Sequence, residues 1–191
     1  MSVPKRLVVG LSGASGMPYA LDLLQTLRRI DGLETHLVMS QGAKRVLVEE
    51  AELSLEALEN LAHVVHRSSD LGAPIASGSF RTLGMVIVPC SATTLAKVAY
   101  GLADNLLTRA AYVTLKERRP LVLVPRETPL PLPSLEAMVK AAQAGATILP
   151  ASPGFYHKPQ GIGDLLGFIT QRILDLLGLE ASRAPRWGER G

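Results

Sequence analysis

Three glycines and two serines share one short turn near the start of the chain, GLSGASG, at residues 10–16. The apolar run RLVVGL precedes the turn, and Pro18 suits the first turn of a following helix. Strand, glycine turn and helix in this order present backbone N–H groups to an anion. The turn therefore suits a mononucleotide phosphate or a flavin edge, and the alternative is a tight turn that binds nothing.

Three well-defined versions of such a turn do not fit these letters. The dinucleotide fingerprint needs glycines two residues apart at its start, and here the first spacing is G-x-x-G. No Gly-Lys-Ser/Thr follows, which excludes the nucleotide-binding P-loop. The nucleophile elbow G-x-S-x-G fails at Ser12 and at Ser15, because Ala14 and Met17 stand where it needs glycine.

Two further turns carry hydroxyl groups in the same position relative to a strand. Ser40 closes the apolar run THLVMS, and Ser91, Thr93 and Thr94 follow MVIVPC. Ligands of open parallel sheets bind beyond the carboxyl ends of the strands. Three hydroxyl-bearing strand ends therefore strengthen the interpretation of this edge as a binding site, whereas Cys90 among them is typical of a small core residue.

Short apolar runs alternate with helical patterns along the whole chain. The predicted strands are 6–11, 35–40, 63–66, 85–91, 120–125 and 147–150. The predicted helices follow Pro18, cover 42–50 and 54–60, follow residue 91, and cover 105–117, 134–144 and 162–177. This alternation predicts an α/β fold with a parallel sheet and helices on both faces. We expect one domain over 1–180 and a C-terminal tail over 181–191.

Bulk composition limits the function further. The formal charge of +3 is small and the basic residues are scattered, which disfavours nucleic-acid binding. A single cysteine fits a reducing compartment. The start of the chain has no long apolar run of the secretory type, and the most apolar later window, 83–103, contains polar residues typical of a buried strand and helix. We therefore expect a cytoplasmic protein without a membrane span.

Basic and phenolic side chains gather in the second half of the chain. Arg109 and Lys116 are seven residues apart and so share one helix face, and Arg126 with Glu127 follows a strand end. Each of these charges alone is more often a solvated surface group. An arginine at the carboxyl end of a buried strand is harder to explain in that way, because ligands bind there.

These segments together resemble the UbiX-type flavin prenyltransferases. The resemblance is carried by GLSGASG, ASGSFRT, VPCS, DNLLTRAA, LKERRPLVLVPRETPL and PGFYHKPQ, and extends from about residue 7 to Trp187. It implies a Rossmann- or flavodoxin-like subunit, typically assembled as a dodecamer. It further implies transfer of a dimethylallyl group from dimethylallyl phosphate to reduced FMN, giving a prenylated FMN with a fourth ring that is released to a UbiD-type decarboxylase.

The resemblance also assigns roles to individual residues, by position in this chain. Implied FMN contacts are Gly13, Ala14, Ser15, Ser40, Ser91, Ala92, Thr93, Thr94 and Arg126. Implied contacts to dimethylallyl phosphate are Lys116, Arg126, Glu127, Tyr156, Arg172 and, at the prenyl pocket, Trp187. Implied catalytic groups are Ser15, Glu50 and Glu127, and Arg109 matches a position at a subunit contact.

The chemistry of the residues agrees with a transfer that needs no metal ion. Breaking an allylic C–O bond leaves a phosphate and a delocalised cation, and the chain has no Asp-Asp pair for holding magnesium. Preorganised cations and the Tyr156 hydroxyl could stabilise the phosphate instead. Glu127 beside them suits a proton donor to the leaving group, and aromatic faces would shelter the cation.

Two alternatives remain open from the letters alone. A non-catalytic FMN-binding subunit of a decarboxylase would keep the glycine and serine turns without needing Lys116, Glu127, Tyr156 and Arg172 together. An FMN-dependent cysteine decarboxylase of the same fold would need a catalytic histidine after the second strand, and the helix after Ser40 contains none.

Overall fold

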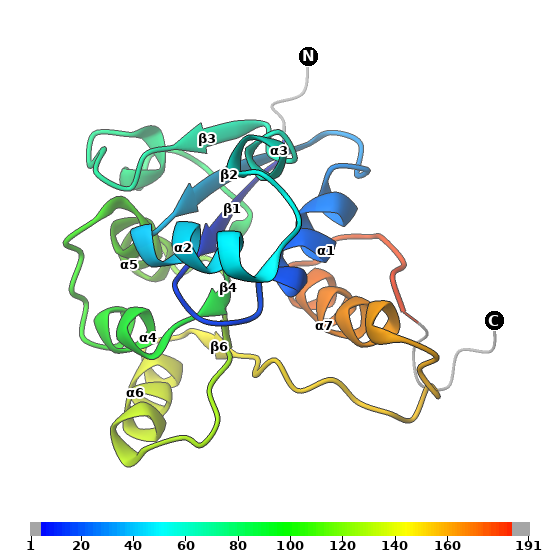
Figure 1. The fold of residues 1–191 in the computed structure, drawn as a ribbon. Helices are drawn as coiled ribbons and strands as arrows, with labels where there is room; N and C mark the ends of the chain where they lie inside the picture. Colours follow the sequence, from blue (N-terminus) through cyan, green and yellow to red (C-terminus); the bar gives the residue numbers. More distant parts are fainter. Residues whose placement is uncertain (1–4, 185–191) are drawn as a thin grey trace.

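The computed structural model describes residues 5–184, which form one six-stranded sheet with helices on both faces (Figure 1). All paired strands are parallel, in the order β3-β2-β1-β4-β5-β6. The strands are β1 Lys5–Leu11, β2 Leu33–Met39, β3 Val64–His66, β4 Gly84–Cys90, β5 Leu121–Pro125 and β6 Thr147–Ile148. The predicted α/β class, parallel sheet and flavodoxin-like arrangement are confirmed.

Seven α-helices and one short 3-10 helix connect these strands within the described residues. They are α1 Met17–Leu27, α2 Gln41–Glu50, α3 Leu55–Glu59, η1 Pro74–Ala76, α4 Ala92–Ala99, α5 Leu106–Lys116, α6 Leu132–Gln143 and α7 Ile162–Leu176. Most predicted boundaries lie within two residues of these. The sequence did not predict η1, which is a single turn in the loop before β4.

Two hydrophobic layers sandwich the sheet, because alternate strand residues point to opposite faces. Val86 and Val88 of β4 face the layer that contains α1, α2 and α7, whereas Met85 and Ile87 face the layer of α4, α5 and α6. In Figure 1, α1 (blue) and α7 (orange) lie side by side on one flank, and α4, α5 and α6 lie on the other. The continuous apolar strands therefore correctly predicted a sheet that is covered by helices on both faces.

The strand order reverses between β1 and β4. From β1 the chain proceeds outward to β2 and β3, and then returns to place β4 on the other side of β1. Such a switch point leaves a crevice beyond the carboxyl ends of the two central strands. The GLSGASG turn leaves β1 at this crevice, and the PCSATT turn leaves β4 there.

Residues 179–184 follow α7 and fold back onto the helical layer. Leu179 is buried there, and Ala181 packs against the same core cluster. The division at residue 180 stays a prediction, and Trp187 lies outside the described residues. None of the helices within 5–184 is both long and apolar enough to cross a lipid bilayer.

Candidate active site

Ser12 ties the two central strands together at the crevice. Its fully buried hydroxyl donates to the Pro89 carbonyl oxygen at 2.9 Å and accepts from the Ser91 backbone N–H at 2.7 Å. A buried hydroxyl with both bonds satisfied is a structural element rather than a ligand group. Of the two serines in the glycine turn, Ser12 is buried and Ser15 is exposed.

A close contact between two backbones explains Gly13. A Cβ placed on Gly13 would lie 2.9 Å from Gly42 Cα and 3.0 Å from the Gly42 carbonyl carbon. The glycine turn therefore rests directly on the first turn of α2, which Ser40 caps by accepting from Ala43 N–H at 3.1 Å. The sequence offered no signal for Gly42, because its role exists only in this tertiary contact.

The N-terminus of α1 is occupied by a side chain from α2. Glu50 Oε2 accepts hydrogen bonds from the backbone N–H groups of Gly16 at 2.8 Å and Met17 at 2.9 Å. Gly16 has φ 128°, which residues with a Cβ rarely adopt, and this conformation aims its N–H at the carboxylate. A carboxylate at a helix N-terminus is favoured by the unpaired N–H groups and by the helix dipole.

The environment keeps Glu50 ionised. Partial burial opposes the charge and alone would raise the pKa of this carboxyl. Hydrogen bonds from the Ser15 hydroxyl and from the Gly16 and Met17 N–H groups, with the nearby Arg126 charge, outweigh burial and hold the pKa below its ordinary value. At neutral pH Glu50 is therefore a proton acceptor and not a donor.

Arg126 joins this group from the end of β5. Its Nε donates to the Ser15 carbonyl oxygen at 2.9 Å, and its aliphatic stem lies 3.9 Å from where a Cβ on Gly16 would be. Ser15, Glu50 and Arg126 are 35 to 111 positions apart in the chain, yet they meet at one point beside the switch. We call these three residues the Ser15–Glu50–Arg126 cluster.

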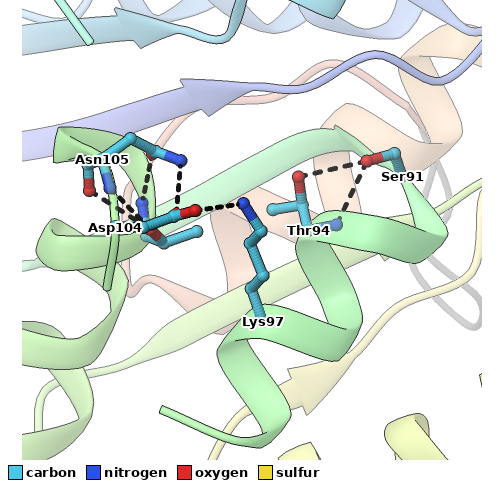
Figure 2. A network of polar contacts seen from close by, with 6 residues as sticks. Ser91, Thr94, Lys97, Asp104 and Asn105 are labelled. Carbon is cyan, nitrogen blue, oxygen red and sulfur yellow. Dashed lines mark hydrogen bonds and ion pairs between the residues drawn. The ribbon is translucent and has the colours of Figure 1, made fainter. Parts of the chain in front are cut away.

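The third strand-end turn presents hydroxyls beside this cluster. Ser91 caps α4: its Oγ accepts from Thr94 N–H at 3.3 Å and donates to Thr94 Oγ1 at 3.1 Å (Figure 2). Thr93 between them is exposed. Further along α4, Lys97 reaches Asp104 with Nζ and Oδ2 2.5 Å apart, which fixes α4 against the start of α5 (Figure 2). The α4 N-terminus is thus capped by Ser91 and leaves Thr93 exposed.

The chain is similar to known flavoproteins over nearly its whole length. Residues 1–173 match the family model Flavoprotein. The chain is 62% identical over 188 residues to the flavin prenyltransferase UbiX of Deinococcus radiodurans, covering 98% of this chain and 96% of that protein. The structure of AnUbiX (PadA1) in complex with FMN and dimethylallyl pyrophosphate superposes with a TM-score of 0.94 at 43% identity, covering 98% of this chain and all of that one. A dodecameric FMN-dependent UbiX-like decarboxylase from Escherichia coli O157:H7 gives 0.93 at 45% identity, over 96% of this chain and 100% of that one.

The chain belongs to the UbiX-type flavin prenyltransferases, within the flavoprotein family.

The structure brings together only some of the residues that the UbiX resemblance assigns to the prenyl phosphate. Arg126 and the exposed Glu127 lie at the carboxyl end of β5, beside a small cleft of about 110 Å³ that Met138 and Ser152 also line. Tyr156, in the loop before α7, is about half exposed and packs edge-on against Phe168. Among residues 5–184, a larger hollow lies at the far end of α1, lined in part by Thr26 and Leu179.

Lys116 lies at the opposite end of the sheet from Arg126. It ends α5, pairs with Glu117 at 2.5 Å, and comes close to Gly78 in the loop that enters β4. The five-residue strand β5, at about 3.3 Å per residue, separates this end from Arg126. Within one chain the two cations therefore do not share a site.

Two other assigned cations have local partners. Arg172, on the outer face of α7, pairs with Asp175 at 3.2 Å, and Arg109 lies over the Tyr112 ring at 5.7 Å. Among the described residues no three His, Cys, Asp or Glu side chains gather as a metal site would require. The roles assigned to Lys116, Tyr156, Arg172 and Glu127 remain predictions.

The contact between Gly13 and Gly42 gives a first test. Gly13→Ala should lower FMN affinity at least tenfold, because its methyl group cannot fit without moving the glycine turn away from α2. Fluorescence titration with FMN measures this directly. Gly163→Ala, where a Cβ meets nothing within 4 Å, is the matched control and should bind FMN normally. Equal affinities for both variants would contradict the close-contact explanation.

The lowered pKa of Glu50 gives a second test. A carboxyl whose pKa is lower in the folded state than in the unfolded state stabilises the fold above its ordinary value of 4.5, and loses that contribution as pH falls through the folded value. At pH 7 the free energy of unfolding of Glu50→Gln, measured by urea denaturation, should therefore be about 1 kcal/mol lower than that of wild type. This difference in unfolding free energy between wild type and Glu50→Gln should disappear as the pH is lowered below 4.5. A gap that is independent of pH would show that the charge of Glu50 contributes nothing.

Proposed function

We propose that this chain is a flavin prenyltransferase that transfers a dimethylallyl group from dimethylallyl phosphate to reduced FMN. The C–O bond of the donor breaks, inorganic phosphate leaves, and the five-carbon group becomes bonded to the flavin. The prenylated FMN is released to a UbiD-type decarboxylase. The names of close relatives support this activity, and the observation in this chain that carries it is the Ser15–Glu50–Arg126 cluster at the switch point.

The position of Glu50 restricts how FMN would bind at the three strand-end turns. Because Glu50 occupies the N–H groups at the start of α1, a second anion is disfavoured there. The flavin phosphate would instead use the N-terminal turns of α2 and α4, with Ser40, Ser91, Ala92, Thr93 and Thr94. Gly13 and Ala14 would then contact the flavin, and its ring edge would lie near the exposed Ser15. When bound and reduced, FMN supplies the electron pair for the new bond.

The cluster residues can divide the proton and charge transfers of such a reaction. Glu50 is anionic and hydrogen-bonded to Ser15, so this pair can accept a proton from the flavin edge. Arg126 can hold the donor phosphate by charge-assisted hydrogen bonds while its Nε stays on the Ser15 carbonyl. Glu127, next in sequence, would protonate the leaving phosphate in this scheme.

The phosphate site is completed by other copies of the chain. Lys116 cannot reach Arg126 within one chain, yet both are assigned to the same phosphate, and a homo-oligomer resolves this conflict. A solved relative is dodecameric, and apolar side chains stand exposed on α6, including Leu132, Leu135 and Val139. We propose a homododecamer in the cytoplasm, with Arg109 at a subunit contact and Trp187 at the prenyl pocket.

The two alternative functions agree less well with the residues of this chain. A non-catalytic FMN-binding subunit would have no need for Lys116, Glu127, Tyr156 and Arg172 together. A cysteine decarboxylase of this fold would need a histidine after the second strand. The helix α2 that follows β2 places Glu50 at the crevice and contains no histidine.

The mass of the flavin tests the transferase function. Incubating the protein anaerobically with reduced FMN and dimethylallyl phosphate should raise the flavin mass by one five-carbon prenyl unit, and a parallel incubation with the pyrophosphate identifies the donor. Glu50→Gln should retain FMN but lose about 10²–10⁴-fold in turnover, which separates enzymatic from spontaneous alkylation. An unchanged flavin mass with both donors would defeat the proposal.

Mixing two inactive variants tests the shared site. Arg126→Ala and Lys116→Ala should each reduce turnover strongly as homo-oligomers, because each removes a cation from the phosphate. Co-assembled from both chains, the oligomer should regain part of the wild-type activity, because some sites receive an intact Arg126 from one copy and an intact Lys116 from another. If mixed oligomers stay as inactive as the parents, Lys116 does not act across the interface.

A further inference from the structure

The last described segment, residues 179–184, is bound to α7 through one side chain. Gln171 is almost fully buried, and its Oε1 accepts from the backbone N–H groups of Arg183 at 2.7 Å and Ala184 at 3.4 Å. Its Nε2 donates to the Ala181 carbonyl oxygen at 3.2 Å. We call residues 179–184 the C-terminal strap, since three of its backbone groups form hydrogen bonds with the Gln171 side chain.

The Gln171 side chain also forms a hydrogen bond along α7. Gln171 Nε2 also donates to Asp175 Oδ1 at 2.9 Å, one turn further along α7. The second oxygen of that carboxylate, Oδ2, accepts from Arg172 NH1 at 3.2 Å. A continuous chain of hydrogen bonds therefore links the strap, Gln171, Asp175 and the exposed guanidinium of Arg172.

A second anchor fixes the strap against α1. The buried carboxylate of Asp22 accepts from Thr170 Oγ1 at 2.6 Å and from Arg183 Nε at 3.0 Å. Gly167 lets the strap approach α7, because a Cβ there would lie 3.0 Å from the Arg183 carbonyl oxygen. A buried carboxylate that loses its cation is costly, so this end of the strap is strongly held.

We infer that Gln171 and Asp175 are positioning residues for Arg172, which they hold ready for the phosphate of the prenyl donor. The inference rests on the proposed function, in which Arg172 binds that phosphate. It adds that the orientation of this arginine is set by the C-terminal strap through Gln171 and Asp175, neither of which touches the substrate.

Preorganisation supplies the physical reason. An exposed arginine loses rotamer freedom when it binds, and a side chain already restrained loses less. The contact with Asp175 uses one N–H of Arg172, and the guanidinium keeps further donors for phosphate oxygens. Because Gln171 in turn fixes the Asp175 carboxylate, removing either residue should leave Arg172 charged but poorly oriented.

The test compares binding of the two substrates. Asp175→Ala and Gln171→Leu should each raise the KM for dimethylallyl phosphate about tenfold. The Kd for FMN and the turnover at saturating donor should stay within twofold of wild type, because the cluster at the switch point is untouched. A loss confined to donor KM is not what general destabilisation would produce.

Thr170→Val is the matched control. It removes a buried hydrogen bond to Asp22 on the neighbouring position of α7, but not the link from Gln171 to Arg172. This variant should lose thermal stability comparably to Gln171→Leu and keep the wild-type KM. A rise in its KM equal to that of Gln171→Leu would overturn the inference, as would an unchanged KM in both Asp175→Ala and Gln171→Leu.

Calorimetry with inorganic phosphate keeps this result separate from the transferase proposal. The FMN-loaded wild type should bind phosphate more tightly than Asp175→Ala or Gln171→Leu, whether or not any flavin is alkylated. Weaker phosphate binding by both variants supports the positioning role even if the flavin mass never changes. Equal phosphate affinity in all three proteins contradicts it even if the wild type is an active transferase.

Discussion

The contact between the Glu50 carboxylate and the N-terminus of α1 determines how the whole crevice is used. It joins the last residue of α2 to the first turn of α1 across 34 positions of sequence. The N–H groups that would otherwise attract an anion are already satisfied, so the strongest anion site of the glycine turn is internal. In the proposed function, the ligand phosphate would therefore bind at the neighbouring turns, and a neutral or weakly polar ligand edge would lie beside Ser15.

This arrangement keeps opposite charges close without letting them cancel. Glu50 is held ionised by hydrogen bonds as well as by Arg126, so the guanidinium is not consumed by a direct pair and its Nε lies on the Ser15 carbonyl instead. A reaction that separates phosphate from an allylic cation needs two fixed groups side by side. One is a positive group that holds the phosphate, and the other is a negative group that stabilises the cation. The other cations lie on separate surfaces, Lys116 at the far end of the sheet and Arg172 on α7. In the proposed oligomer, each would contribute to a phosphate site.

The fold could be predicted because its signals are local. The apolar strands end at glycine or serine, and the helices begin with Pro18 or a capping serine. These patterns leave few alternatives to a parallel sheet with helices on both faces. The short strand β3 was recognised as well, although it has only three residues. The contacts of Ser12, Gly42 and Gln171 were not predicted, because each depends on a partner more than ten positions away or on a backbone approach that leaves no pattern in the letters.

The sequence by itself determined the class of fold and, through motifs spread over most of the chain, the family, and it predicted which end of the sheet carries the hydroxyl-bearing turns. Only the tertiary structure decided that Ser12 is buried and Ser15 is exposed, and that α1 directs its N–H groups at Glu50. It also separated Lys116 from Arg126 by the length of a strand, although both belong to one continuous motif. The physical reason is that periodicity fixes which side of an element a residue occupies, whereas the end of the sheet it reaches depends on the direction in which each element runs.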